Sequence, residues 1–174
     1  MSEQELKSFV TALDRHAARV ASTLESLPAG SYDFRPDAGG RSIGEMSWHL
    51  AEVEAYMTYG IERGTFSFTD KPPGIERPRE IAALAPAYRT IHADAVARVG
   101  AWKPEVLEGR VTFFDGKERA VRDVVWEATL HHGIHHLGQL VTMVRLAGGT
   151  PPGLFGPNRE MTHAMREAAA ARQG

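Results

Sequence analysis

The sequence predicts an all-α fold, a four-helix bundle with a short β-hairpin before the last long helix. Two observations predict it. Four stretches carry apolar residues at alternating spacings of three and four, and segments rich in glycine and proline separate them. The 174 residues are enough for one domain with a sizeable core. Because no internal repeat is found, residues 1–174 are expected to form a single domain.

The first helix is expected from Ser2, which forms a capping-box pattern with Glu5. An apolar stripe follows, consisting of Leu6, Phe9, Leu13, Ala17, Val20, Leu24 and Leu27. Prolines and glycines in residues 28–41 break this rhythm and predict a loop.

A second capping-box pattern, Ser42 with Glu45, begins the next helix. Its stripe consists of Ile43, Met46, Leu50, Val53 and Met57. The pattern fails at Gly60 and Gly64, so residues 64–77 are expected to be a connection.

The third helix is expected after this connection, with Pro78 in its first turn. Its stripe consists of Ile81, Leu84, Tyr88, Ile91, Ala95, Val99 and Trp102. Pro86 should kink or restart this helix, because proline cannot donate the backbone hydrogen bond of a helix interior.

Two very short strands are expected on either side of Asp115-Gly116, a strong hairpin signal. Such a hairpin is too small to be stable alone and must lean on the helices. The fourth long helix should run from about residue 121 to 147, and a short helix over about 158–171 ends the chain.

Composition excludes several classes of function. With 20 Lys+Arg against 22 Asp+Glu, the chain lacks the excess of positive charge that nucleic-acid binding needs. It has no cysteine, so a metal would have to be held by histidine or carboxylate. No run approaches the ~18 apolar residues of a membrane span, and residues 1–5 do not resemble an export signal. A cytoplasmic protein with a small-molecule partner, and neither nucleic acid nor membrane, is therefore expected.

Four of the eight histidines lie in residues 131–136 and form two pairs spaced by four. Either pair would place two imidazoles one turn apart on one helix face. The face of His132 and His136 continues through apolar positions that include Val125, Met143 and Leu146, and also through Gln139. The face of His131 and His135 continues through Glu127, Gly138, Thr142 and Arg145. His132 and His136 are therefore placed on the core face of the helix, and His131 and His135 on the more solvent-exposed face.

Imidazoles on an inner face need partners, and a divalent metal can satisfy one nitrogen of each. His49, between Met46 and Val53, is the candidate third ligand from another helix. Gln139 could orient a ligand or hold a bound water, or simply pack between helices, and Glu52 could accept the distal N–H of His49 or be solvated. The other histidines are interpreted as solvated, hydrogen-bonded or core-edge groups: His16, His92, His131, His135 and His163.

Residues 132–139 read HGIHHLGQ, which resembles the H-x-x-H-H-R-G-Q signature of the DinB/YfiT-like superfamily. Trp48-His49-Leu50 resembles that family's first-ligand motif, and residues 149–157 resemble its loop after the last long helix. The order of elements matches over nearly the whole chain. One departure is Leu137, where the family has arginine.

The resemblance implies a DinB-type bundle, a homodimer, and a divalent metal held by His49, His132 and His136. Related families include S-transferases that use low-molecular-weight thiols, maleylpyruvate isomerases and proteins described as metal-dependent hydrolases. Three imidazoles leave at least one coordination position open on a metal such as Zn²⁺ or Ni²⁺. Water bound there would ionise near neutral pH, and a bound thiol would lose its proton.

The leading hypothesis is a divalent-metal-dependent enzyme, either a thiol-dependent S-transferase or a hydrolase of small molecules that uses metal-bound water. Since the chain has no cysteine, S-transfer would need an external low-molecular-weight thiol as cosubstrate. The first alternative is a non-catalytic metal-binding or stress-response protein, and the second is an all-α protein whose histidine cluster is incidental. The signatures G-x-S-x-G, Walker A and Rossmann are absent, which disfavours serine hydrolases, P-loop nucleotide enzymes and dehydrogenases.

Overall fold

The computed structural model describes residues 2–172 and confirms the all-α bundle with a small hairpin. Three of its long helices are α1 (Ser2–Glu25), α2 (Ile43–Arg63) and α3 (Ile81–Gly100). The fourth is continuous but has three segments, which are α4 (Val121–Asp123), the π-helical η2 (Val124–His131) and α5 (His132–Leu146). Almost all residues of the predicted stripes are buried, which confirms the helical periodicity.

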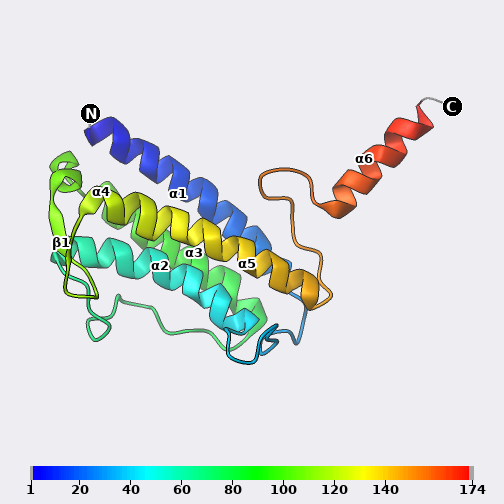
Figure 1. Cartoon of the computed structure of the whole chain (residues 1–174), viewed down its shortest axis with the longest axis horizontal. Coiled ribbons are helices and arrows are strands. Elements are labelled where there is room, and N and C mark those ends of the chain that lie inside the picture. Colours follow the sequence, from blue (N-terminus) through cyan, green and yellow to red (C-terminus); the bar gives the residue numbers. More distant parts are fainter. Residues whose placement is uncertain (1, 173–174) are drawn as a thin grey trace.

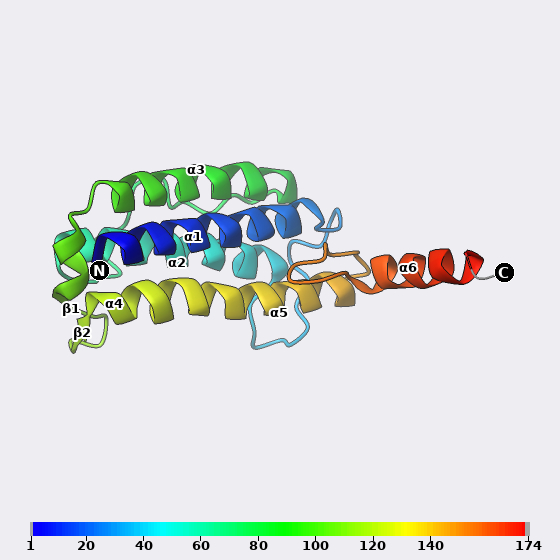
Figure 2. The ribbon, with the colours of Figure 1, turned by 90° about the horizontal axis from the view of Figure 1, so that it is seen from above.

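Helices α2 and α1 lie at opposite corners of the bundle, because each contacts both α3 and α5. The segment between α2 and α3 runs back along the length of the bundle, so these two helices point the same way (Figure 1). The short helix α6 (Arg159–Ala171) projects beyond the end of the bundle (Figure 2), and none of its residues is buried. Among residues 2–172, no helix combines the length and the apolar character needed to cross a bilayer.

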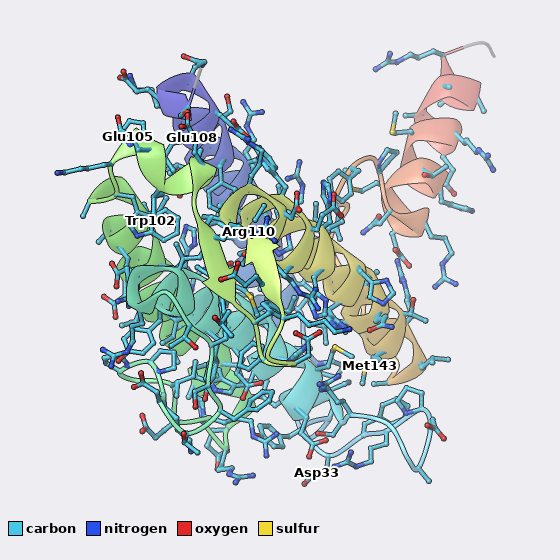
Figure 3. The ribbon with its side chains drawn as sticks, turned by 60° about the vertical axis from the view of Figure 1, so that its left-hand side comes forward. Asp33, Trp102, Glu105, Glu108, Arg110 and Met143 are labelled. Carbon is cyan, nitrogen blue, oxygen red and sulfur yellow. The ribbon has the colours of Figure 1, made fainter. Side chains whose placement is uncertain are left out.

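The hairpin pairs β1 (Arg110–Thr112) with β2 (Glu118–Ala120), and Gly116 supplies the positive φ of the turn. Together with the short helix η1 (Pro104–Glu108) it lies at the end of the bundle that comes forward in Figure 3. As expected, the hairpin is hydrogen-bonded to the rest of the fold. The amide of Phe66 donates to the carbonyl of Thr112 at 3.0 Å, just beyond the end of α2.

Two local expectations were wrong. Ser2 lies inside α1, and its hydroxyl donates to Glu108, while Glu5 accepts hydrogen bonds from Arg122 and Trp126. Tertiary contacts have therefore replaced the predicted capping box.

The second concerns Pro78, which was expected in the first turn of α3, and the restart that was one of the two outcomes expected at Pro86. Helix α3 begins at Ile81, beyond Pro78, and it passes Pro86 without restarting. Pro86 is the sixth residue of the helix, so it removes only one hydrogen bond near the helix start.

The core consists of two apolar clusters, one at each end of the bundle. Polar side chains lie at the level where the clusters meet, and five of them are buried: His16, Glu54, Thr58, Thr129 and His136. Glu54 accepts hydrogen bonds from Tyr88 and, at 2.8 Å, from His92 Nδ1. His92 Nε2 lies 3.0 Å from Asp14, so this network joins α1, α2 and α3.

Gly133 lets α5 approach α1 closely at this level. A Cβ at Gly133 would lie 2.7 Å from His16 Nε2, whereas a Cβ at Gly138 in the same helix would meet nothing within 4 Å. We expect Gly133→Ala to lower the free energy of unfolding by about 1–3 kcal/mol, as overpacking does. The matched control, Gly138→Ala, should raise it by up to ~1 kcal/mol through helix propensity. Urea unfolding measures both, and equal effects of the two substitutions would contradict this account.

Candidate metal centre

His49 is held by a well-anchored α2. The helix starts with the predicted capping box, in which Ser42 and Glu45 each accept from the other's backbone amide. The residues that flank His49 are buried: Leu50 lies in the core, and Trp48 donates its indole N–H to the carbonyl of Ile75 at 2.8 Å. The imidazole of His49 is therefore fixed at the edge of the core, facing α5.

The imidazoles of His132 and His136 meet His49 from the first turns of α5. His132 Nε2 lies 2.9 Å from His136 Nε2 and 3.4 Å from His49 Nε2. One nitrogen of each of the three rings lies within 4.8 Å of the others. The structure thus brings together the three histidines that the sequence selects.

These histidines lie at the edge of the core rather than on its central line. Leu137, Leu140 and Val144 are fully buried, whereas Gln139 and Leu146 on the predicted core face are exposed. The expectation that His132, Gln139 and Leu146 share a core face was therefore too broad.

The π-helical segment η2 lies directly before His132. Its hydrogen bonds span five residues: the amide of His132 bonds the carbonyl of Glu127, and the hydroxyl of Thr129 bonds the carbonyl of Val124. A five-residue hydrogen-bond pattern changes the periodicity directly before the histidines. The sequence analysis assumed regular α-helix and missed it, although such segments are frequent at functional sites.

Two neighbouring side chains orient the rings. Gln139 Oε1 lies 2.7 Å from His136 Nδ1, and Glu52 Oε2 lies 3.4 Å from His49 Nδ1. Because both oxygens are acceptors, the Nδ1 atoms carry the protons, and the Nε2 atoms present lone pairs to the cluster. Gln139 also donates to His135 Nε2 at 3.1 Å.

A divalent metal fits this arrangement of donors. His132 Nε2 faces the lone pairs of both other rings, and a single proton on it could satisfy only one of them. Tetrahedral Zn²⁺ with nitrogen ligands at about 2.0–2.1 Å would place them about 3.3 Å apart. Two of the observed separations, 2.9 and 3.4 Å, are close to this value, and all three nitrogens lie within 4.8 Å of one another, so His49, His132 and His136 could hold an ion after a small movement of the rings.

Protonation of His132 and His136 is disfavoured. Burial, followed by the charges of His49, His132 and Arg41, lowers the pKa of His136 to about 4, although the hydrogen bond that His136 donates to Gln139 acts to raise it. Burial and the neighbouring imidazoles also lower the pKa of His132. Neutral imidazoles are the form that binds metal.

The remaining histidines lie outside this cluster. His131 is exposed and pairs with Glu127 at 3.1 Å, and His163 is exposed on α6. His92 belongs to the hydrogen-bond network of the buried Glu54. The sequence gives no sign of this network, because its members are far apart along the chain. His16 is buried with an unpartnered Nδ1, and burial lowers its pKa.

The model of the DinB superfamily matches residues 12–140 of this sequence, a range that includes all three histidines. The chain belongs to the DinB superfamily. It is also 24% identical to the uncharacterized protein YrdA of Bacillus subtilis (strain 168), over 90% of this chain and 92% of that one.

Two solved structures share the fold. A DinB-like protein from Bacillus cereus ATCC 10987 superposes with a TM-score of 0.71 at 21% identity, covering 86% of this chain and 97% of that one. The DinB-like protein YjoA from Bacillus subtilis also gives 0.71, at 22% identity, covering 87% and 99%. The resemblance inferred from the histidine motif is confirmed at the level of family and fold.

Alanine substitutions should separate the two histidine pairs. We expect His132→Ala or His136→Ala to abolish stoichiometric metal binding, because each removes one of three converging nitrogens. His131→Ala and His135→Ala should weaken binding far less. Zinc and nickel titrations with elemental analysis of untagged protein measure this, and the opposite order would show that the other helix face binds the metal.

Binding should also persist in mild acid. Since the pKa of His136 is lowered to about 4, protons compete poorly for its nitrogen, and release should occur below the pH of about 6 expected for ordinary histidines. In the metal-free protein, the ring signals of His136 should titrate with a midpoint near pH 4 by NMR. A midpoint near 6.5 would contradict the inferred environment.

Proposed function

We propose that this protein is a divalent-metal-dependent enzyme acting on small molecules, with the ion held by His49, His132 and His136. One observation carries the proposal: three imidazole nitrogens converge beside a pocket of about 600 Å³, and His49 and His132 form part of its wall. A purely structural metal site is closed by four protein ligands, whereas a catalytic site keeps a position open toward its substrate.

Each part of the chain has a distinct task in this proposal. Gln139 fixes the ring of His136 and Glu52 that of His49, which directs their Nε2 atoms into the cluster. The pocket supplies a partly apolar space next to that point. When bound, the ion would act as a Lewis acid that lowers the pKa of a water or thiol. Zn²⁺ and Ni²⁺ both suit imidazole ligands.

Two reactions are compatible with this arrangement. In S-transfer, an external low-molecular-weight thiol would be the nucleophile, because the chain has no cysteine. In hydrolysis, water would take that place. S-transfer is the first choice because thiol-dependent transferases are among the related families.

A turnover screen tests the proposal. Zinc- or nickel-loaded protein is incubated with electrophiles, with and without a low-molecular-weight thiol, beside metal-free protein and the His136→Ala variant. The control is His163→Ala, which removes an exposed histidine of α6. Thiol-dependent turnover that requires the metal and His136 would support S-transfer, and thiol-independent turnover would support hydrolysis. Stoichiometric metal without turnover would favour the non-catalytic alternative.

We also propose that the protein is a homodimer. Large apolar side chains remain exposed on α6, at the end of α5 and in the loop between them: Leu146, Phe155, Met161 and Met165. Such surfaces commonly mark interfaces. Light scattering at micromolar concentration should give the mass of two chains, and the mass of one chain would overturn this proposal. The cytoplasmic location and the absence of nucleic-acid and membrane partners stay predictions from the sequence.

A further inference from the structure

The pocket beside the histidine cluster has a defined shape and size. Its volume of about 600 Å³ is in the range of small-molecule sites. One wall is the face of α2 that carries Val53, Tyr56 and Met57. Phe114 of the hairpin turn and Phe68 of the segment after α2 also line the pocket. His49 and His132 line the pocket as well, so a ligand bound in the pocket would reach the histidine cluster.

Part of the pocket lining is aromatic. Phe114 stacks on Phe68, with ring centroids 4.3 Å apart and an interplanar angle of 20°, and it also contacts Tyr56 at 6.3 Å. Phe68 is 72% exposed, although large aromatic side chains usually bury most of their surface. The ring of Phe68 therefore offers a flat apolar surface in the lining of the pocket.

The charged groups of the pocket are mostly engaged elsewhere. Glu127 pairs with His131 at 3.1 Å, and Glu52 lies 3.4 Å from His49. Arg119 bonds Asp115 at 3.0 Å and lies over the ring of Phe113.

Arg41 differs from these groups. Within residues 2–172, no carboxylate lies at ion-pair distance from its guanidinium. Its side chain lines the same pocket as His49 and His132. Arg41 is therefore an uncommitted cation in the pocket that His49 and His132 also line, where it could bind an anionic group.

We propose that the pocket binds a small carboxylate with a flat apolar body, the carboxylate at Arg41 beside the histidine cluster and the body against Phe114 and Phe68. This inference rests on the proposed function, since it names the substrate class for the same site. Tyr56 adds a hydrogen-bond donor, because burial and then the charge of Glu52 raise its pKa and keep the phenol protonated. A neutral ligand of the same shape would leave Arg41 without an ionic partner. A carboxylate without the apolar body would leave the rings of Phe114 and Phe68 exposed to water.

Three probes test separately the contact of the carboxylate with Arg41 and the contact of the flat body with the aromatic rings. trans-Cinnamate has a carboxylate and a flat body, cinnamamide has the same shape without the charge, and acetate has the charge without the body. Affinities are measured by calorimetry on metal-free and on zinc-loaded protein. Cinnamate should bind about tenfold more tightly than either of the others, as expected for one charge-assisted contact or one buried ring. Equal affinities for cinnamate and cinnamamide, or no saturable binding, would overturn the proposal.

Substitutions assign each contact. Arg41→Gln should reduce cinnamate affinity about tenfold and leave cinnamamide affinity unchanged. Phe114→Leu should weaken both aromatic probes together. Arg166→Gln, a control for loss of an exposed arginine on α6, should change neither. Loss of cinnamate binding in the Arg166 variant, or unchanged binding in the Arg41 variant, would show that the carboxylate is held elsewhere.

Zinc stoichiometry, measured in every variant, distinguishes failure of this inference from failure of the proposed function. Arg41 and Phe114 are not metal ligands in this account, so their variants should bind zinc like the original chain. If zinc binds and cinnamate shows no preference, the substrate class is wrong and the metal site stands. If no zinc binds at the three histidines but metal-free protein still prefers cinnamate through Arg41, the substrate class stands and the proposed function fails.

Discussion

The packing of α2 against α5 determines the geometry of the histidine cluster. His49 precedes the buried Leu50, and His136 precedes the buried Leu137, so each imidazole is adjacent to a core side chain of its own helix. The same contacts that exclude water from the core therefore set the separations between the Nε2 atoms. A site built on packed helices holds its donors more precisely than one built on loops. Where the family signature has arginine, this chain has the fully buried Leu137, which contributes to that packing instead.

Polar groups inside the bundle add a second constraint at the same level. Glu54 is buried, and a buried carboxylate is costly unless it is hydrogen-bonded or paired. Burial lowers the pKa of His92, but its contacts with Glu54 and Asp14 outweigh this effect, so the pKa is raised. A charged His92 would compensate both carboxylates. This network fixes α1, α2 and α3 at the level of the cluster, because any slip of one helix would leave a charge unpaired.

Much of the fold could be predicted from the sequence, because apolar periodicity reports directly which helix faces are buried. The cluster could be predicted as well, since His132 and His136 share a helix face and His49 lies at the edge of another stripe. Other features depend on contacts that no local pattern encodes. Glu54 and His92, which are hydrogen-bonded, lie 38 positions apart in the sequence. The π-helical segment η2 breaks the assumed α-helical periodicity. Glu5 accepts a hydrogen bond from Arg122 on another helix instead of capping α1. The aromatic part of the pocket lining likewise joins Tyr56, Phe68 and Phe114 from three separate segments.

Crystals of the zinc-loaded protein test the central claim most directly, because anomalous scattering at the zinc edge locates the ion without reference to activity. The account predicts one strong peak about 2.0–2.1 Å from an imidazole nitrogen of each of His49, His132 and His136. A peak beside His131 and Glu127 instead, or no ordered peak in protein that contains stoichiometric zinc, would contradict it.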